Sequence, residues 1–254
     1  MMGFFWGIEK YIIKQKGVFM NNEIIIPIGK TEKGNDLVCN LIKAPHIFIG
    51  GKTASGKSVF LHKTIKYLMH NYSTEEIKLL LIDTKHIEFD IYNGLPHILG
   101  NNAVWQEEDI TYSLNNLLRE LHYRYNLFVQ NDVINIDEYN EKTEQSLSQI
   151  IVIIDELVDI IYNDKTLIPT FKQLLSMGKA CGFHFIIATQ RPEEDIVPYE
   201  IIANTPTRIA FGLDCAETSK FIVGEYGAEK LKNSGELLYN GIDFIKPIKA
   251  TVPF

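Results

Sequence analysis

The stretch Phe48–Phe60, FIGGKTASGKSVF, decides the fold. Its segment Gly51–Ser58 matches G-x-x-x-x-G-K-[ST], and it lies between an apolar run, HIFIG, and a segment with helical spacing of apolar residues, Lys57–Tyr72. A glycine loop between a strand and a helix is the context in which this pattern binds nucleotide phosphates. The glycines let backbone amides point at an anion, and the helix start adds its positive dipole end. The stretch therefore predicts a phosphate-binding loop.

Each residue type in the loop has an expected role. The Lys57 ammonium is expected to contact the β- and γ-phosphates, and the Ser58 hydroxyl to bind magnesium. ATP and Mg²⁺ are therefore the expected cofactors. The alternative is a tight glycine turn that binds nothing. The predicted nucleotide-binding residues are Gly51, Lys52, Thr53, Ala54, Ser55, Gly56, Lys57, Ser58 and Val59.

Short apolar runs alternate with helical segments along the chain. The runs Ile77–Asp83, Ile150–Glu156 and Phe183–Gln190 are too short for typical helices and are rich in isoleucine or leucine. Helical patterns precede them at 57–72, 109–130 and 167–181. This alternation predicts an α/β fold with a mostly parallel central sheet flanked by helices. A further strand is expected at TRIAFGL (207–213), with β-hairpins at 23–42 and from ELLYN to the C-terminus.

The second apolar run ends in an acidic pair, Asp155 and Glu156. Ligands of parallel α/β sheets bind at the carboxyl ends of the strands. We expect Asp155 to orient magnesium and Glu156 to polarise the attacking water, which makes hydrolysis the expected reaction. The alternative for the aspartate is a helix cap. Thr189 and Gln190 end the third run, where Gln190 is expected to contact the γ-phosphate.

Composition sets broad limits on the class of protein. The chain has 254 residues, 46% of them hydrophobic, and a net charge of −7. It is expected to form one domain, 23–254, preceded by an amphipathic extension, 1–22, whose charged residues interrupt it well short of a membrane span. The three cysteines are far apart, which argues against a zinc site or a disulfide framework and favours a reducing, cytosolic compartment. An acidic chain lacks the basic face typical of nucleic-acid binding, unless a basic patch lies inside a ring.

Seven segments resemble, in order, the motor domain of the FtsK/SpoIIIE family of DNA translocases, over about Pro27 to Phe254. The Walker A stretch APHIFIGGKTASGKSV is the first, and IIVIIDELVDI is similar to the family's Walker B strand. The other matching segments are LLIDTKHIEFDIYNGLPHIL, ELHYRYNLF with IDEYNEK, CGFHFIIATQRP, ANTPTRIAF, and GAEKL with GELLY.

The resemblance implies a RecA-like P-loop ATPase that forms a hexameric ring around DNA, with ATP held between subunits. It also implies an arginine that completes the neighbouring subunit's site. Lys179, in GKACGFH, stands where that arginine is expected. Lysine keeps the charge but loses the planar, two-pronged geometry. Lys179 is the preferred candidate, followed by Arg208, with Arg191 as a further alternative.

Two other departures concern DNA and domain content. Ile202, in YEIIAN, replaces a lysine of the family, and Glu193, Glu194 and Asp195 lie just upstream, which weakens the expectation that this loop grips DNA. The family's membrane-spanning part and winged-helix domain have no counterpart in a chain this short. A stand-alone motor of plasmids or other mobile elements is therefore expected, with relaxase, replication or membrane-channel partners. It is expected in the cytoplasm, or at the membrane through a partner.

Two rival functions remain at this point. Related domains power type VII secretion, and an acidic face suits a polypeptide better than a phosphate backbone. A nucleotide-bound scaffold with little turnover is the other rival, because Lys179 replaces the arginine.

Overall fold

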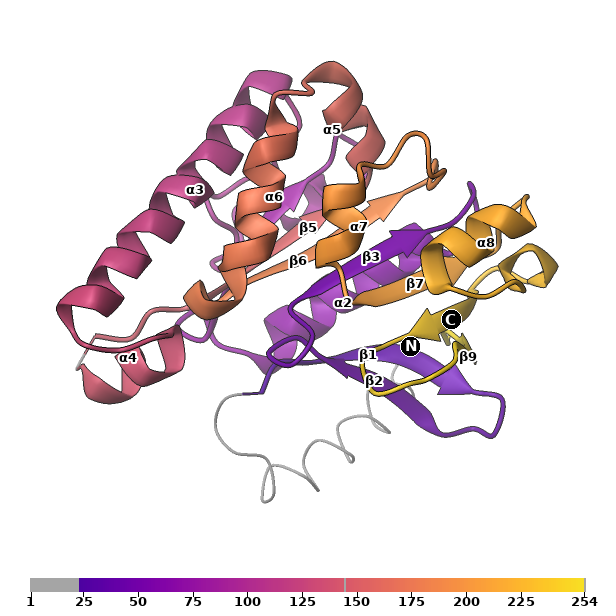
Figure 1. Ribbon diagram of the computed structural model, residues 1–254, viewed down its shortest axis with the longest axis horizontal. Helices are drawn as coiled ribbons and strands as arrows, with labels where there is room; N and C mark the ends of the chain where they lie inside the picture. The colour runs from indigo at the N-terminus through magenta and orange to yellow at the C-terminus, as the bar shows by residue number, and fades with distance from the viewer. Residues whose placement is uncertain (1–22, 144, 254) are drawn as a thin grey trace.

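A single nine-stranded sheet forms the centre of the computed structural model, which describes residues 23–143 and 145–253 (Figure 1). The strand order is β2-β1-β9-β8-β7-β3-β6-β5-β4. The strands are β1 (Ile25–Thr31), β2 (Asp36–Asn40), β3 (His46–Gly50), β4 (Ile77–Ile82), β5 (Gln149–Ile154), β6 (Phe183–Thr189), β7 (Thr207–Phe211), β8 (Glu236–Asn240) and β9 (Ile248–Thr251). The predicted extension 1–22 lies outside the described residues.

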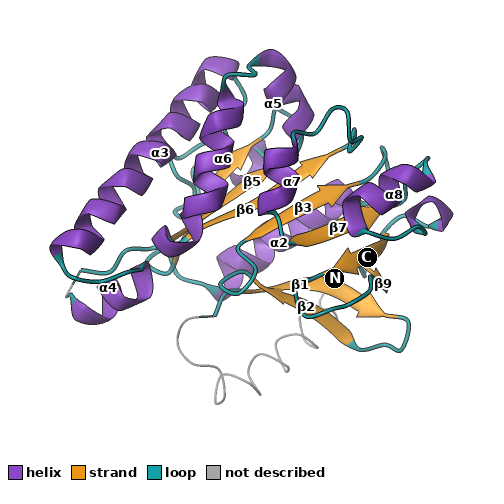
Figure 2. Cartoon of the chain, viewed as in Figure 1, coloured by secondary structure: helices purple, strands orange, loops and turns teal. Residues whose placement is uncertain are grey.

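Helices cover both faces of this sheet (Figure 2). The α-helices are α2 (Lys57–Asn71), α3 (Glu107–Gln130), α4 (Ile136–Lys142), α5 (Leu157–Asn163), α6 (Leu167–Met177), α7 (Tyr199–Asn204) and α8 (Ala216–Val223). Three 3₁₀ turns accompany them, η1 (Asp90–Tyr92), η2 (Gly178–Cys181) and η3 (Ala228–Lys230). No helix in the described part of the chain combines the length and the apolarity needed to cross a bilayer.

The strands β4, β5, β6, β3 and β7 are neighbours and all run parallel. Their side chains are almost entirely buried, which explains why their sequences read as continuous apolar runs. Because the strands share one direction, all five carboxyl ends lie at one edge of the sheet. The α/β fold with a mostly parallel core is therefore confirmed.

Antiparallel strands extend the sheet beyond β7. The predicted hairpins are confirmed: β1 pairs with β2, and β8 with β9. A pairing between β1 and β9 joins the two hairpins, so the first and last described strands are neighbours.

The sheet separates two hydrophobic cores. On one face, α2 and the β1–β2 hairpin pack against side chains such as Ile47 and Ile49 of β3. On the other face, residues of α3, α5, α6, α7 and α8 pack against Phe48 and the alternate residues of the neighbouring strands. Successive side chains of β3 therefore point into opposite cores, as the alternation of side chains along a strand requires.

Several element boundaries differ from the expectation. The helix expected at 167–181 is α6 followed by η2, because the chain tightens to a 3₁₀ turn before Gly182, whose φ is +77°. The run expected to end at Glu156 ends as a strand at Ile154. The short helices α5, α7 and α8 were not predicted, since six to eight residues give too few turns for a clear helical period.

Arg124 is a buried charge that fastens α3 to the amino-terminal edge of the sheet. Its guanidinium Nη1 donates to the carbonyls of Ser148 (2.9 Å) and Cys181 (2.7 Å), and its Nε pairs with Glu120 (2.8 Å). The side chain also lies over the Phe183 ring, 5.1 Å from its centroid. The ELHYRY match therefore has a structural explanation, because this arginine holds η2 in place.

We expect Arg124→Met to lower the free energy of unfolding by about 2–4 kcal/mol, because the buried Cys181 carbonyl and the partly buried Ser148 carbonyl lose their donor at about 1–3 kcal/mol each. Urea denaturation followed by circular dichroism measures the change. The control is Arg119→Met on the exposed side of the same helix, expected to cost less than about 0.5 kcal/mol. Equal effects of the two substitutions would contradict the assignment.

Candidate nucleotide-binding site

The glycine loop follows β3 directly and turns into α2. Gly56 precedes the helix with φ +108°, a conformation that side chains disfavour, and a Cβ there would lie 2.7 Å from the Gly235 nitrogen. A Cβ on Gly51 would lie 2.7 Å from Cβ of Phe211. Both glycines of the motif are thus required by close packing against neighbouring segments. The predicted reason for their presence was different, namely backbone amides that point at an anion, and it stays a prediction.

Distant parts of the chain brace the loop from two sides. The Lys52 amide donates to the Gly212 carbonyl (3.0 Å), and the Lys52 ammonium pairs with Asp214 (2.8 Å), both in the segment after β7. The Gly235 amide donates to the Ser55 carbonyl (2.9 Å). Sequence analysis missed Asp214 and the bracing role of Gly235, although the glycine belongs to the GELLY match.

Lys57 is buried at the first position of α2, with only 5% of its surface exposed. Its Nζ donates to the Gly51 carbonyl and to the Lys52 carbonyl (3.2 Å). Burial lowers the pKa of Lys57 to about 8, against the opposing effect of the Glu156 and Asp155 carboxylates. Nearby, the buried hydroxyl of Ser55 has no hydrogen-bond partner among the described residues. A buried cation and an unpaired hydroxyl in a backbone cradle fit a phosphate group.

Asp155 lies directly after β5, and its amide donates to the Ile82 carbonyl (3.1 Å). No described residue donates a hydrogen bond to its carboxylate. Burial, together with the charges of Glu88, Asp83 and Glu156, raises the pKa of Asp155 to about 6, while Lys57 acts in the opposite direction. A carboxylate held among other carboxylates without a donor fits a divalent cation, and the half-buried hydroxyl of Ser58 offers a second oxygen.

The adjacent carboxylate, Glu156, already has partners on the next strand. Its oxygens accept hydrogen bonds from the Thr189 hydroxyl and from the Gln190 amide, the latter at 2.9 Å to Oε2. Glu156 therefore joins the ends of β5 and β6. Because a carboxylate oxygen has two lone pairs, Oε2 keeps the capacity to accept one more bond.

Gln190 contacts the glycine loop through its side chain. The Thr53 hydroxyl donates to Oε1 of Gln190 at 2.7 Å. The structure thus brings together the predicted site residues Lys57, Ser58, Asp155, Glu156 and Gln190 at the carboxyl edge of the parallel strands, with Val59 exposed on the first turn of α2.

Lys179 lies at the opposite edge of the sheet from its own glycine loop. It belongs to η2, which precedes β6, and its Nζ contacts the Lys43 carbonyl at 3.4 Å. The seven residues of β6 separate this edge from Gln190 by about 20 Å, at roughly 3.3 Å per residue. Lys179 cannot reach the nucleotide site of its own chain.

Arg208, near the start of β7, has a guanidinium directed into its own subunit. It donates to the carbonyls of Ile202 (2.8 Å), Thr205 (3.2 Å) and Ile222 (3.4 Å). Ile202 is itself buried, whereas the acidic residues Glu193 to Asp195 are exposed. The contacts of Arg208 are those of a structural residue that joins α7, β7 and α8.

Comparison with known proteins places this geometry among ATPases that share its fold. The model of the FtsK/SpoIIIE family matches residues 19–194. Proteins named DNA translocase FtsK from Caldanaerobacter subterraneus and Clostridium acetobutylicum are both 37% identical to the chain, over 97% and 92% of its length. The chain spans only 35% and 32% of those relatives.

Solved structures share the fold at lower identity. The pCW3 conjugation coupling protein TcpA with ATPγS superposes with a TM-score of 0.76 at 23% identity, covering 91% of this chain and 66% of that one. The type VII secretion ATPase EccC of Thermomonospora curvata gives 0.74 at 18% identity, covering 91% of this chain and 28% of that one.

We expect Asp155→Asn to stabilise the nucleotide-free protein by about 1–3 kcal/mol at pH 7.5, because the raised pKa means that folding opposes ionisation of this group. Below the unfolded pKa of 3.8 the carboxyl is protonated in both states, so the advantage of the variant disappears. It grows as pH rises from 3.8 to about 6 and is then constant.

Urea denaturation in EDTA between pH 4 and 8 measures this difference. Asp195→Asn, at an exposed position, is the matched control and should leave the stability unchanged. A loss of stability in Asp155→Asn at pH 7.5 would contradict the electrostatic account of the site.

Proposed function

The chain belongs to the FtsK/SpoIIIE family, and from that membership we propose that it is an ATP-hydrolysing motor that moves DNA, in the transfer or replication of a plasmid or other mobile element. The observation that carries the proposal is the cradle around Lys57, joined to Asp155 and Glu156 at one sheet edge. Relatives named DNA translocases support DNA as the track, and the likeness to a conjugation coupling protein supports transfer as the process.

Each residue of the site has a proposed part in hydrolysis. The Lys57 ammonium exchanges its carbonyl partners for the β- and γ-phosphates. Oε2 of Glu156 accepts a hydrogen bond from the attacking water, while Thr189 and the Gln190 amide keep the carboxylate oriented. Gln190, held by Thr53, senses the γ-phosphate.

Magnesium is the proposed metal, with Ser58 and Asp155 as the residues that hold it. When bound, the ion supplies a Lewis acid that neutralises charge on the phosphates. The fit rests on the Asp155 carboxylate, which receives no hydrogen bond from the described residues.

A homohexameric ring is the proposed assembly, as membership of the family implies, and it accounts for a Lys179 that lies on the far edge of the sheet from its own loop. In a ring of like-oriented subunits, that edge faces the neighbour's nucleotide. We place Lys179 there as the residue that stabilises charge on the transferring phosphate. Arg208 is the weaker candidate, since three of its five N–H donors are already used within the subunit.

We expect duplex or single-stranded DNA at low salt to raise the ATPase rate severalfold, and Lys57→Ala to abolish the activity through the loss of the phosphate-binding charge. A coupled assay with and without each nucleic acid measures the rate. Glu156→Gln should bind ATP but stall hydrolysis. A wild-type rate that neither DNA raises would contradict the motor, and stimulation by polypeptide instead would favour secretion.

The placement of Lys179 is tested by mixing subunits. Lys179→Ala and Lys57→Ala should each be inactive alone, yet mixed rings contain sites with an intact loop and an intact neighbouring Lys179. We expect partial activity in the mixture, on the order of a quarter of the wild-type rate for random assembly of independent sites. Mixed rings as inactive as the separate variants would contradict action between subunits.

A further inference from the structure

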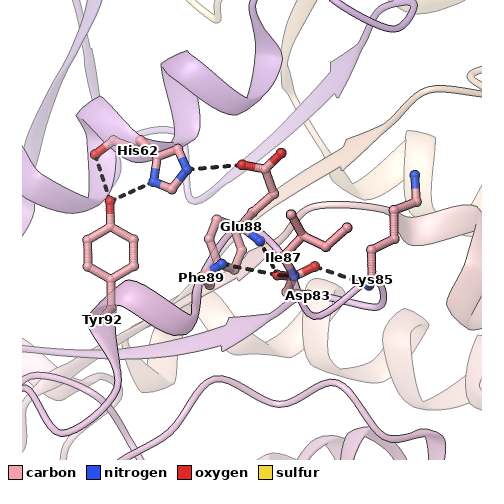
Figure 3. Close-up of polar contacts among 7 residues, drawn as sticks. All are labelled: His62, Asp83, Lys85, Ile87, Glu88, Phe89 and Tyr92. Carbon is pink, nitrogen blue, oxygen red and sulfur yellow. Dashed lines mark hydrogen bonds and ion pairs between the residues drawn. The ribbon is translucent and has the colours of Figure 1, made fainter.

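A turn after β4 places a further carboxylate near the nucleotide site. Asp83 is buried, and its oxygens accept four backbone amides, those of Lys85 (3.1 Å), Ile87 (2.9 Å), Glu88 (2.6 Å) and Phe89 (3.0 Å) (Figure 3). Three of these bonds go to Oδ2 and one to Oδ1, so they hold the Asp83 carboxylate within its own turn. The result is a rigid backbone at the carboxyl edge of the sheet from which Glu88 extends.

His62 holds the Glu88 carboxylate, and Tyr92 in turn holds His62. Figure 3 shows His62 between Glu88 and Tyr92, with Nε2 at 3.1 Å from Glu88 Oε2 and Nδ1 at 2.7 Å from the Tyr92 hydroxyl. Because a carboxylate only accepts, Nε2 donates to Glu88. The Tyr92 hydroxyl also donates to the His62 backbone carbonyl at 3.4 Å. His62 is on α2, four residues after Ser58, so both side chains lie on one face of the helix.

The other oxygen of Glu88 is open. No donor among the described residues contacts Oε1, and about a third of the side chain, 31%, is exposed. The Glu88 amide donates to Asp83, which follows β4, and Ile82 of β4 lies opposite Ile154 of β5, the residue before Asp155. The turn that carries Glu88 therefore lies beside the end of β5, and His62 ties the Glu88 carboxylate to the face of α2 that carries Ser58.

The four carboxylates at this edge divide into two pairs. Asp83 accepts four backbone amides, and Glu156 accepts hydrogen bonds from Thr189 and Gln190. The Asp155 carboxylate and the Oε1 oxygen of Glu88 accept no hydrogen bond from the described residues. Two such neighbouring anions, next to the Ser58 hydroxyl, are stabilised by a divalent cation with its water shell.

We propose that Glu88 is a further residue of the magnesium site, whose open oxygen accepts a hydrogen bond from a water molecule on the ion held by Ser58 and Asp155. His62 and Tyr92 are positioning residues that hold this carboxylate. Mg²⁺ bound to phosphates keeps several water molecules. A carboxylate that does not contact the metal can accept hydrogen bonds from these waters. The inference rests on the proposed function and adds to it the residue that orients the hydrated metal.

The test is a magnesium titration of nucleotide binding. A fluorescent, non-hydrolysable ATP analogue is added at a fixed concentration, and binding is followed by anisotropy as Mg²⁺ is increased. We expect Glu88→Gln to raise the Mg²⁺ concentration for half-maximal binding about tenfold, as is typical when an outer-shell partner is lost. Binding of the analogue in EDTA should be unchanged or tighter, because a negative charge has been removed near the phosphates.

Two variants complete the design. Glu75→Gln removes the same charge from an exposed position at the far end of α2 and should behave as wild type. His62→Leu keeps the Glu88 carboxylate but removes its support. It should raise the Mg²⁺ concentration for half-maximal binding by a smaller factor than Glu88→Gln does. It keeps the inference testable if Glu88→Gln unfolds, which thermal denaturation without nucleotide reports.

The outcomes separate the inference from the proposed function. Equal half-saturating Mg²⁺ in wild type and Glu88→Gln overturns the role of Glu88 while leaving nucleotide binding intact. An equal loss of binding with and without Mg²⁺ also overturns it, because a purely structural tie between α2 and the turn would give that result. Wild-type protein that binds no analogue under either condition overturns the ATPase as well.

Discussion

The parallel strands concentrate charge at one edge of the sheet, and the site depends on that constraint. A buried ammonium, Lys57, faces carboxylates that follow β4 and β5, in a region where burial penalises every charge. Lys57 is satisfied by loop carbonyls, while Asp155 has no donor among the described residues. The arrangement is electrostatically unfavourable without a ligand, and the proposed ligand, a metal-bound triphosphate, would supply both an anion for Lys57 and a cation for Asp155.

The glycine loop is held by residues far along the chain, so the antiparallel extension of the sheet is part of the site. Gly235 donates to the loop at Ser55, and the Val252 amide donates in turn to the Gly235 carbonyl at 2.9 Å. Val252 follows β9, which pairs with β1. Hydrogen bonds therefore connect the β1–β2 hairpin to the glycine loop through β9, Val252 and Gly235. They give a physical route between this hairpin and the nucleotide site.

Local patterns were sufficient to predict the glycine loop, the acidic pair and the alternation of strands and helices, because each depends on residues close in sequence. Contacts between distant residues were not accessible in this way. The ion pair of Lys52 and Asp214 joins residues 162 apart, and the donors to Glu156 come from a different strand. Arg208 illustrates the same limit: its hydrogen bonds to the carbonyls of Ile202, Thr205 and Ile222 could not be predicted from its place in the sequence.

A crystal structure with magnesium and a non-hydrolysable ATP analogue tests the central claim most directly. The account predicts phosphate oxygens on the amides of residues 51–58, Lys57 Nζ moved from the Gly51 carbonyl to the β- and γ-phosphates, and Ser58 and Asp155 beside the metal. A nucleotide bound elsewhere, with Lys57 still on the Gly51 carbonyl, would contradict it.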